Sequence, residues 1–301
     1  MVSSRSTPIT MVPGANAMPA GDTLIGTDLS RHHPVSFNYD ESLANQAGGL
    51  RMPNTLVQDV RLEDGQVQCT SCHDAHNNQY GKFLVMDNTS SAICQSCHVP
   101  NRWSVSSHAL STATWSGSGT DPWPNTDQTT VAANACENCH RPHAAQISGR
   151  LLKFTPDEQN CNVCHSGTVA SKNVASEFNK ISAHPIVSTS GIHDPVEDPV
   201  NSTRHVACED CHNPHAATGT SASAPAASGA LAGVRGVNGS GMVVQQIQNE
   251  YELCFRCHAD SGNRGPSRVQ RQFVQTNTRL EFNPGNTSYH PVIAAGKQTT
   301  S

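Results

Sequence analysis

Hydrophobic residues occur along this chain in short patches that polar residues separate. The clearest patches are Phe83-Leu84-Val85 and Leu151-Leu152, in a sequence with long stretches of Ser, Thr and Asn. No patch approaches the roughly 18 apolar residues that cross a bilayer, so the pattern predicts no transmembrane segment. We expect a mostly irregular fold, in which coil predominates and helices are limited to short turns.

The composition predicts a core that the side chains alone do not fill. Only 36% of the 301 residues are hydrophobic and 5% are aromatic, beside 18 prolines and 22 glycines. Such a chain would be largely disordered without further apolar groups. The formal net charge is -5 and no basic patch is present, which argues against a nucleic-acid partner.

All twelve cysteines belong to six copies of Cys-x-x-Cys-His. In this motif two thiols can bond the vinyl groups on one porphyrin edge, and the following histidine can reach the iron. Zinc ribbons and disulfide frameworks need no histidine directly after the second cysteine. The sequence therefore predicts six covalently attached haem c groups and a haem-cored multihaem cytochrome c, with short helical turns after the motifs. The predicted attachment and iron-binding residues are Cys69, Cys72 and His73; Cys94, Cys97 and His98; Cys136, Cys139 and His140; Cys161, Cys164 and His165; Cys208, Cys211 and His212; and Cys254, Cys257 and His258.

The six motifs group into three pairs, which form an internal repeat of about 70 residues. The third pair is longer than the others, and its Ala/Gly/Ser/Thr-rich stretch 216–241 is interpreted as a flexible surface insertion. We expect an N-terminal arm (1–31), a single hexahaem domain (32–282) and a C-terminal arm (283–301). Within the domain the repeats cover about 32–103, 104–180 and 181–282.

A histidine follows the first motif histidine of every pair by three residues. These are His76, His143 and His215. Residues three apart on a helical turn face the same side, but the porphyrin would block access to the iron that the motif histidine already holds. The spacing therefore predicts that each binds the iron of the second haem in its own pair, attached at Cys94, Cys161 or Cys254 respectively.

A second recurring element is His-Pro followed by a β-branched residue. It begins at His33, His184 and His290, and His108 takes the corresponding place before the second pair without the proline. Proline stiffens the segment and favours an extended conformation before it. These histidines are predicted as further iron ligands, whereas His193 and His205 are predicted to be bystanders. Six scattered methionines are poor competitors, and two-histidine ligation favours low-potential electron transfer over small-molecule chemistry.

The order His-Pro-Val, Cys-x-x-Cys-His-x-x-His, apolar patch and second Cys-x-x-Cys-His resembles the doubled C-x-x-C-H multihaem cytochromes. Within that group, residues 32–292 are similar to the extracellular filament-forming cytochromes of metal-reducing bacteria and of archaea. The resemblance implies little regular secondary structure and haems in alternating parallel and T-shaped contacts. It also implies one iron ligand donated by the adjoining subunit.

The expected function is therefore electron conduction along stacked haems, without enzyme activity, in an extracellular filament. His290 starts the repeat a fourth time, so one histidine is surplus, and His32, His33 or His290 is predicted to bind an iron of the next subunit, unless His290 folds back on its own chain. A periplasmic electron carrier and a nitrite- or hydroxylamine-converting enzyme are the competing functions. Partners would be redox proteins or extracellular acceptors. Residues 1–20 lack the pattern of a signal peptide, so export would require a leader outside this sequence.

Overall fold

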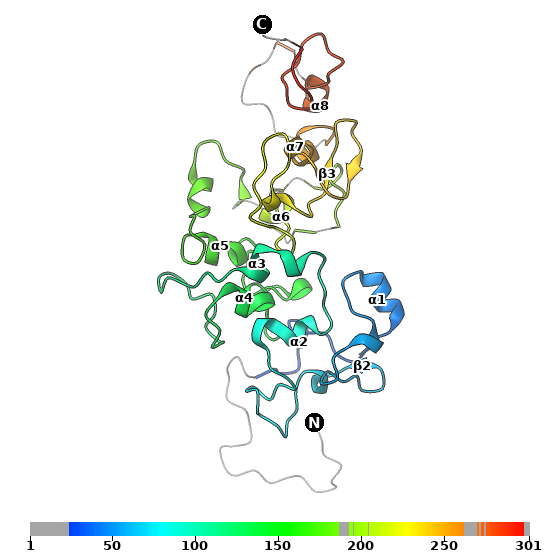
Figure 1. Cartoon of the computed structure of the whole chain (residues 1–301), viewed down its shortest axis with the longest axis vertical. Helices are drawn as coiled ribbons and strands as arrows, with labels where there is room; N and C mark the ends of the chain where they lie inside the picture. The colour runs from blue at the N-terminus through cyan, green and yellow to red at the C-terminus, as the bar shows by residue number, and fades with distance from the viewer. Residues whose placement is uncertain are drawn as a thin grey trace.

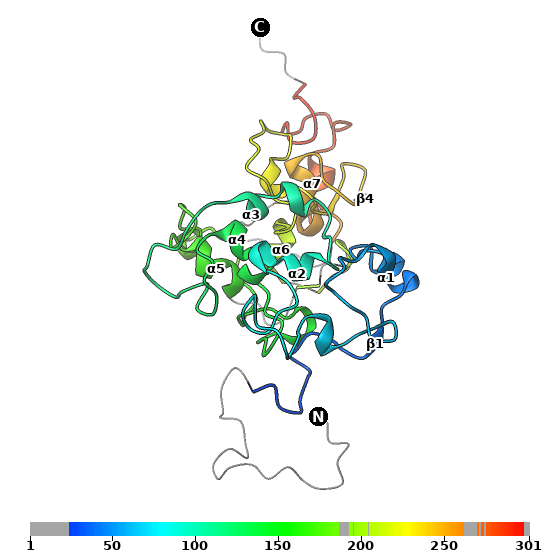
Figure 2. The ribbon, with the colours of Figure 1, turned by 60° about the horizontal axis from the view of Figure 1, so that its bottom comes forward.

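The computed structural model describes residues 24–186, 193–194, 196–203, 205–261, 270, 272–273 and 275–297. In this part of the chain the fold is mostly irregular, and its short elements follow one another along an elongated molecule (Figure 1). The predicted N-terminal arm lies largely outside the described residues. A view turned by 60° shows α1 at one side of the group that contains α2, α4 and α6 (Figure 2).

The helices are short, and polar side chains cap several of them. Asp40 accepts a hydrogen bond from the Leu43 amide at the start of α1, and Gly48 ends that helix with a φ of 65°. Ser106 and Thr130 cap α3 and α4 in the same way. The described helices are α1 (Glu41–Ala47), α2 (Ala92–Gln95), α3 (Ser107–Leu110), α4 (Val131–Asn134), α5 (Gln159–His165), α6 (Cys208–Cys211), α7 (Glu250–His258) and α8 (Thr278–Glu281).

The described residues contain two small antiparallel sheets, of which the first joins segments far apart in the sequence and the second is a local hairpin. Strand β1 (Phe37–Asn38) pairs with β2 (Gln66–Val67), and Phe37 lies opposite Val67. Strand β3 (Gly236–Val237) pairs with β4 (Val243–Val244), and Gly236 lies opposite Val244. None of the described helices has the length and apolar character needed to cross a membrane.

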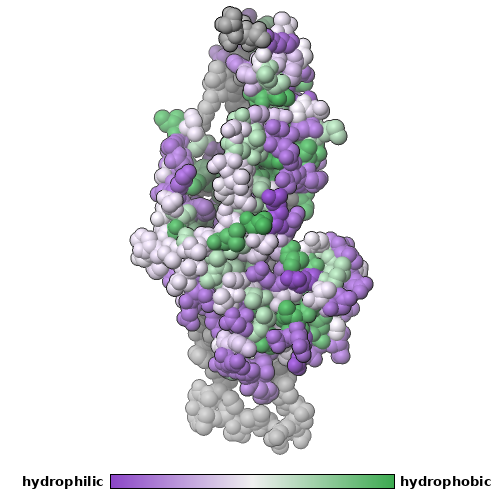
Figure 3. Space-filling model, viewed as in Figure 1, coloured by the Kyte–Doolittle hydropathy of each residue, from purple (hydrophilic) through white to green (hydrophobic). Residues whose placement is uncertain are grey.

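Apolar packing is local rather than gathered in one large core. The main cluster consists of Val237, Phe255 and Ala259, with Tyr251 and Phe282 packed against it. On the face shown in Figure 3, hydrophobic residues form small patches among polar ones. The scarcity of apolar side chains predicted from composition is therefore reflected in the fold.

The interpretation of residues 216–241 as a surface insertion is wrong around Ala216 and residues 234–237, whereas residues 219–226 are exposed. Ala216, Val234 and Val237 are buried, and β3 packs against α7. Gly236 explains this contact, because a Cβ there would lie 2.3 Å from Ile247 Cγ2 and 2.7 Å from the Glu252 carbonyl oxygen. The small residues that resemble a linker permit close backbone packing here.

Candidate haem-binding sites

Each Cys-x-x-Cys-His motif includes a short helical segment. The six segments are Cys69–Ser71, α2, Ala135–Asn138, α5, α6 and α7. A helical turn brings side chains three residues apart to the same side, so α5, α6 and α7, which each contain both cysteines of their motif, present the two thiols together. The predicted helical turns are thus present, but they overlap the motifs rather than follow them.

The first motif histidine of every pair is held in the same way. Nδ1 of His73 donates to the Lys82 carbonyl at 3.0 Å, Nδ1 of His140 to that of Arg150 at 2.8 Å, and Nδ1 of His212 to that of Ala230 at 3.0 Å. The hydrogen on Nδ1 leaves the lone pair on Nε2. A backbone partner that fixes the other ring nitrogen is typical of metal-binding histidines.

Five motif histidines lie opposite a second histidine at a nearly constant spacing. Metal–imidazole bonds are about 2 Å long, so two imidazoles on opposite sides of one ion have centroids on the order of 6 Å apart. The donor set and this spacing fit haem iron with two histidine ligands. The centroid distances are 6.2 Å for His33–His98, 6.0 Å for His73–His143, 6.1 Å for His108–His165, 6.1 Å for His140–His215 and 6.2 Å for His184–His258.

The predicted assignment of His143 and His215 is wrong. His143 lies opposite His73, and His215 lies opposite His140, which are the first motif histidines of the preceding pairs. The assignment assumed one continuous helical turn after the motif. Instead α6 ends at Cys211, and His212 is extended, with φ -131° and ψ 137°. Pro142 and Pro214, which precede these two histidines, also disfavour a helix there.

Hydrogen bonds to the proline carbonyls that precede His143 and His215 also join successive repeats. The His33 amide donates to the Pro142 carbonyl at 2.7 Å, and Nδ1 of His108 donates to the Pro214 carbonyl at 2.9 Å. In each case the segment before one pair docks beside the histidine-bearing segment of the next pair. His33 and His108 thereby face the second motif histidine of their own pair, and His143 and His215 face the first motif histidine of the pair before.

The cysteines of successive motifs are neighbours in chain order. As free thiols, Cys94 hydrogen-bonds with Cys136 and Cys161 with Cys208, and these bonds together with burial raise the pKa of Cys94 and Cys161. In the haem-loaded chain the same sulfur atoms would be thioethers. Within each pair, burial raises the pKa of Cys72, Cys139 and Cys211, and the nearby thiols of Cys97, Cys164 and Cys257 respectively raise it further. The attachment points therefore form one continuous series.

Burial favours the neutral form that binds metal at five of the ten facing histidines. Desolvation lowers the pKa of His98, His140, His143 and His165 below the usual range. The effect is large at His215, where burial and the nearby His140 lower the pKa to about 4. Trp103, itself buried, lies edge-on to His215 at a centroid distance of 6.1 Å.

Three predicted ligands are not placed against another histidine ring in the described part of the chain. His212 is held through Nδ1 but has no facing histidine there. The side chain of His76 is 98% exposed beside Asp74. His290 follows α8, and its neighbours Pro291 and Val292 line a cavity next to the sixth motif. Ligation by these three histidines stays a prediction.

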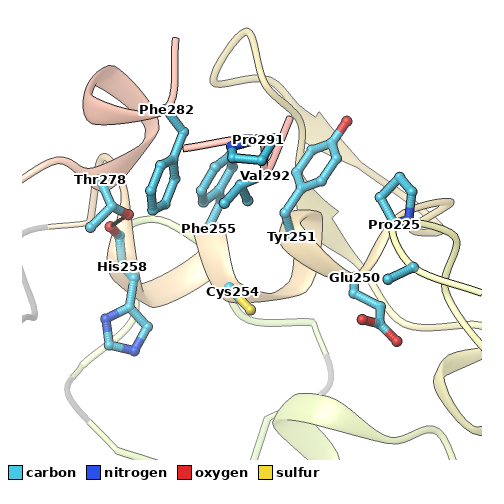
Figure 4. A pocket seen from close by; sticks show the side chains of 11 residues that line it. Pro225, Glu250, Tyr251, Cys254, Phe255, His258, Thr278, Phe282, Pro291 and Val292 are labelled. Atoms are coloured by element: carbon cyan, nitrogen blue, oxygen red, sulfur yellow. Dashed lines mark hydrogen bonds between the residues drawn. The ribbon is translucent and has the colours of Figure 1, made fainter. Parts of the chain in front are cut away.

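That cavity has a volume of about 530 Å³ and lies along α7. Figure 4 shows Cys254 and His258 projecting from one side of the helix, away from Tyr251, Phe255 and Phe282. His184 approaches His258 from a segment far away in the sequence. The sixth site therefore combines both cysteines and a histidine pair with aromatic packing behind the helix.

One residue near the iron sites has a role that sequence reasoning did not identify. Nδ1 of His32 lies 3.2 Å from Nδ1 of His143. His32 therefore orients a facing histidine, rather than extending toward another subunit as predicted. His33, another of the residues predicted to bind an iron of the next subunit, faces His98 in its own chain. The adjacent pair His32-His33 was the only sequence signal.

Comparison with known proteins supports the motif analysis. Residues 62–102 and 129–170 match the doubled CXXCH motif family, and these segments carry the first and second motif pairs. The longer third pair lies outside the two matches. Neither a curated protein nor a solved structure matches the chain.

Proposed function

We propose that this chain is a hexahaem electron-transfer cytochrome whose subunits join head to tail in an extracellular filament. Covalent haem would supply one-electron redox chemistry through iron held by histidine. The chain contains doubled CXXCH motifs, and its mostly irregular fold spaces them along an elongated molecule. Of the described features, the chain-ordered series of cysteines supports conduction most directly.

The series has no gap between pairs. Cys94 and Cys136 come from different pairs but share a hydrogen bond, and so do Cys161 and Cys208. Attachment of neighbouring cofactors at adjoining sulfur atoms would bring their porphyrin edges close together. This supports an electron path that runs in sequence order from the first motif to the sixth.

The ligand order supports the head-to-tail joint. His143 faces the first motif histidine of pair one, and His215 faces that of pair two. By the same rule, the first motif histidine of pair three, His212, needs the equivalent histidine of a following pair. In another copy of this chain that residue is His76, which is 98% exposed here. We therefore assign His76 of one subunit to His212 of the next.

The test compares the parent with His76→Ala and with His290→Ala as the matched control. Electron microscopy and sedimentation measure assembly, and electron paramagnetic resonance measures high-spin ferric haem. The proposal predicts filaments with six low-spin haems for the parent and the control. His76→Ala is expected to remain monomeric with one high-spin haem in six. Filaments that persist in His76→Ala with all haems low-spin would contradict the assigned joint.

One observation favours a second candidate function. His212 has no facing histidine within the described part of the chain, so its iron could be open to a small ligand. If the parent is monomeric and has one high-spin haem that binds nitrite or hydroxylamine, an enzyme function replaces the filament. If the parent is monomeric and wholly low-spin, the protein is a self-contained electron carrier.

A further inference from the structure

A second group of metal-binding side chains lies outside the histidine pairs. It consists of His193, Glu197, His205 and Asp210, and it differs from the haem sites in having two carboxylates. One potential donor atom from each residue lies within 4.8 Å of the others. The first three residues come from the connector before the third pair, and Asp210 lies in α6 inside the fifth attachment motif.

Each histidine of this group has a buried ring nitrogen without a hydrogen-bond partner. The His193 side chain is only 5% exposed, and its Nδ1 has no hydrogen-bond partner although Asp210 Oδ1 lies 3.4 Å away. His205 Nε2 is also buried without a hydrogen-bond partner. Buried polar atoms without partners are costly, which indicates that something absent from the protein chain satisfies them.

The tautomer of His205 shows that its buried Nε2 lacks a hydrogen. Its Nδ1 lies 2.6 Å from the Thr203 carbonyl oxygen, so Nδ1 carries the hydrogen. In the neutral ring Nε2 is then an acceptor, yet it faces Glu197 Oε2 at 3.3 Å and Asp210 Oδ2 at 3.5 Å. Three acceptor atoms, His205 Nε2, Glu197 Oε2 and Asp210 Oδ2, therefore lie close together and repel one another. A cation coordinated by all three would remove this repulsion.

The spacing suits a tetrahedral ion. Zinc binds histidine nitrogen and carboxylate oxygen at about 2.0–2.2 Å, which sets neighbouring donors on the order of 3.4 Å apart. The separations of His205 Nε2 from Glu197 Oε2 and from Asp210 Oδ2, 3.3 and 3.5 Å, agree with this value. His193 Nδ1 lies 3.4 Å from the other Asp210 oxygen, and the four donors together lie within 4.8 Å. Two histidines and two carboxylates also form a donor set that divalent transition metals accept.

The surroundings orient the carboxylates as an outer coordination shell would. Arg256 Nη2 donates to Glu197 Oε1 and to Asp210 Oδ1, each at 3.2 Å, which leaves Glu197 Oε2 and Asp210 Oδ2 facing His205. The Ala207 amide donates to Asp210 Oδ2 at 2.7 Å. The Arg256 cation offsets one of the two carboxylate charges, so a net charge of -1 remains to attract a divalent ion.

We propose that His193, Glu197, His205 and Asp210 bind one divalent transition-metal ion, with Zn²⁺ as the best match. The ion joins the connector segment to α6 and, through Arg256, to α7. It is therefore a structural cross-link between the attachment helices of the fifth and sixth motifs. This site is independent of filament formation, because none of its ligands belongs to the proposed joint.

The test uses the haem-loaded protein, in which the cysteine sulfurs are thioethers and do not compete as thiolates. After treatment with a chelator, the parent is titrated with ZnCl₂, and bound zinc is measured per six irons by elemental analysis and calorimetry. We expect one Zn²⁺ per chain. X-ray absorption at the zinc edge is expected to show only nitrogen and oxygen ligands, at about 2.0–2.2 Å.

Two conservative variants, Glu197→Gln and His205→Gln, each remove one donor. Both are expected to weaken zinc binding by about 10-fold to 100-fold, while the haem spectrum stays unchanged. Glu177→Gln is the matched control, because Glu177 is an exposed acid paired with Lys180. The proposal is overturned if the chelator-treated parent takes up no zinc, if both variants bind it as tightly as the parent, or if sulfur appears among the ligands.

Discussion

His143 lies opposite His73 with ring centroids 6.0 Å apart, although the two residues belong to different repeats. The contact is supported from behind by His32, whose Nδ1 is 3.2 Å from Nδ1 of His143. If these two rings hold one haem iron, the pair would join two repeats through that iron. Each repeat would then depend on the next one for a ligand and would not be an independent folding unit.

The first prediction concerns which iron loses its ligand when His143 is removed. In His143→Ala we expect one of six haems to become high-spin, and that haem is the one attached at Cys69 and Cys72. Its potential should rise because a basic ligand is lost. An isotopically labelled ligand is added, binds the open iron and is photocrosslinked there. Proteolysis and mass spectrometry then identify the peptide that carries the label. Labelling at Cys161 and Cys164 would instead restore the within-pair assignment.

The second prediction treats His32 as a positioning residue. In His32→Ala we expect all haems to remain low-spin, because His143 is still present. The loss of the Nδ1 contact makes the His143 ring less basic and less well oriented, so the potential of one haem should rise. Redox titration with spectral resolution of individual haems measures the shift. His290→Ala is the control; an equal shift there would exclude a specific effect of His32.

The third prediction concerns acid stability near the C-terminal helix. Arg279 donates to both Asp260 oxygens, at 2.7 and 2.6 Å, and this hydrogen bonding lowers the pKa of Asp260. A lowered carboxylate pKa contributes stability above the unfolded-state value of about 3.9, and the contribution disappears as pH falls through the folded value. The pair is partly exposed, so the effect is on the order of 1 kcal/mol or less.

Hydrogen exchange of residues 275–297 checks this expectation. Protection in the parent should decrease as the pH falls below about 4, the unfolded-state value for Asp. In Asp260→Asn it should already be lower at neutral pH and depend less on acid. Identical pH profiles for the two proteins would show that the Arg279 contact does not hold α8.

The fourth prediction tests the close packing of β3 against α7. Gly236→Ala would place a Cβ 2.7 Å from the Glu252 carbonyl oxygen, so the backbone has to move. Overpacking of this kind costs about 1–3 kcal/mol. We expect a lower thermal unfolding midpoint and a disturbed sixth haem. Gly149→Ala is the control, since a Cβ at Gly149 meets nothing within 4 Å.

The attachment residues could be predicted because their chemistry is local. Cys136, Cys139 and His140 lie within five positions, so sequence spacing alone determines what they can bind. The irregular fold followed equally directly from the shortage of apolar residues. By contrast, the partner of His140 lies in the next repeat, and no local rule distinguishes His215 from other candidates. The end of α6 at Cys211 and the proline before His215 exclude the continuous turn that was assumed, but the ring that His215 faces is set by the contact between repeats.

The same limit explains the group around His193. From sequence, His193 and His205 look like isolated histidines in an acidic loop, because Asp210 is hidden inside an attachment motif. Only the folded chain places the four side chains within 4.8 Å. The interpretation of residues 216–241 failed for a related reason: small residues permit flexibility in isolation but also permit tight packing against α7.

The pairing of histidines from successive repeats also affects the order in which the sites can be completed. A polypeptide is made from its N-terminus, so His73 is synthesised about 70 residues before His143, and His140 about as long before His215. Each repeat therefore remains unfinished until the following one has been produced. A chain interrupted after the first or second repeat would carry His73 or His140 without its opposite ring, whereas in the full chain the first motif histidine without a facing ring in the described residues is His212.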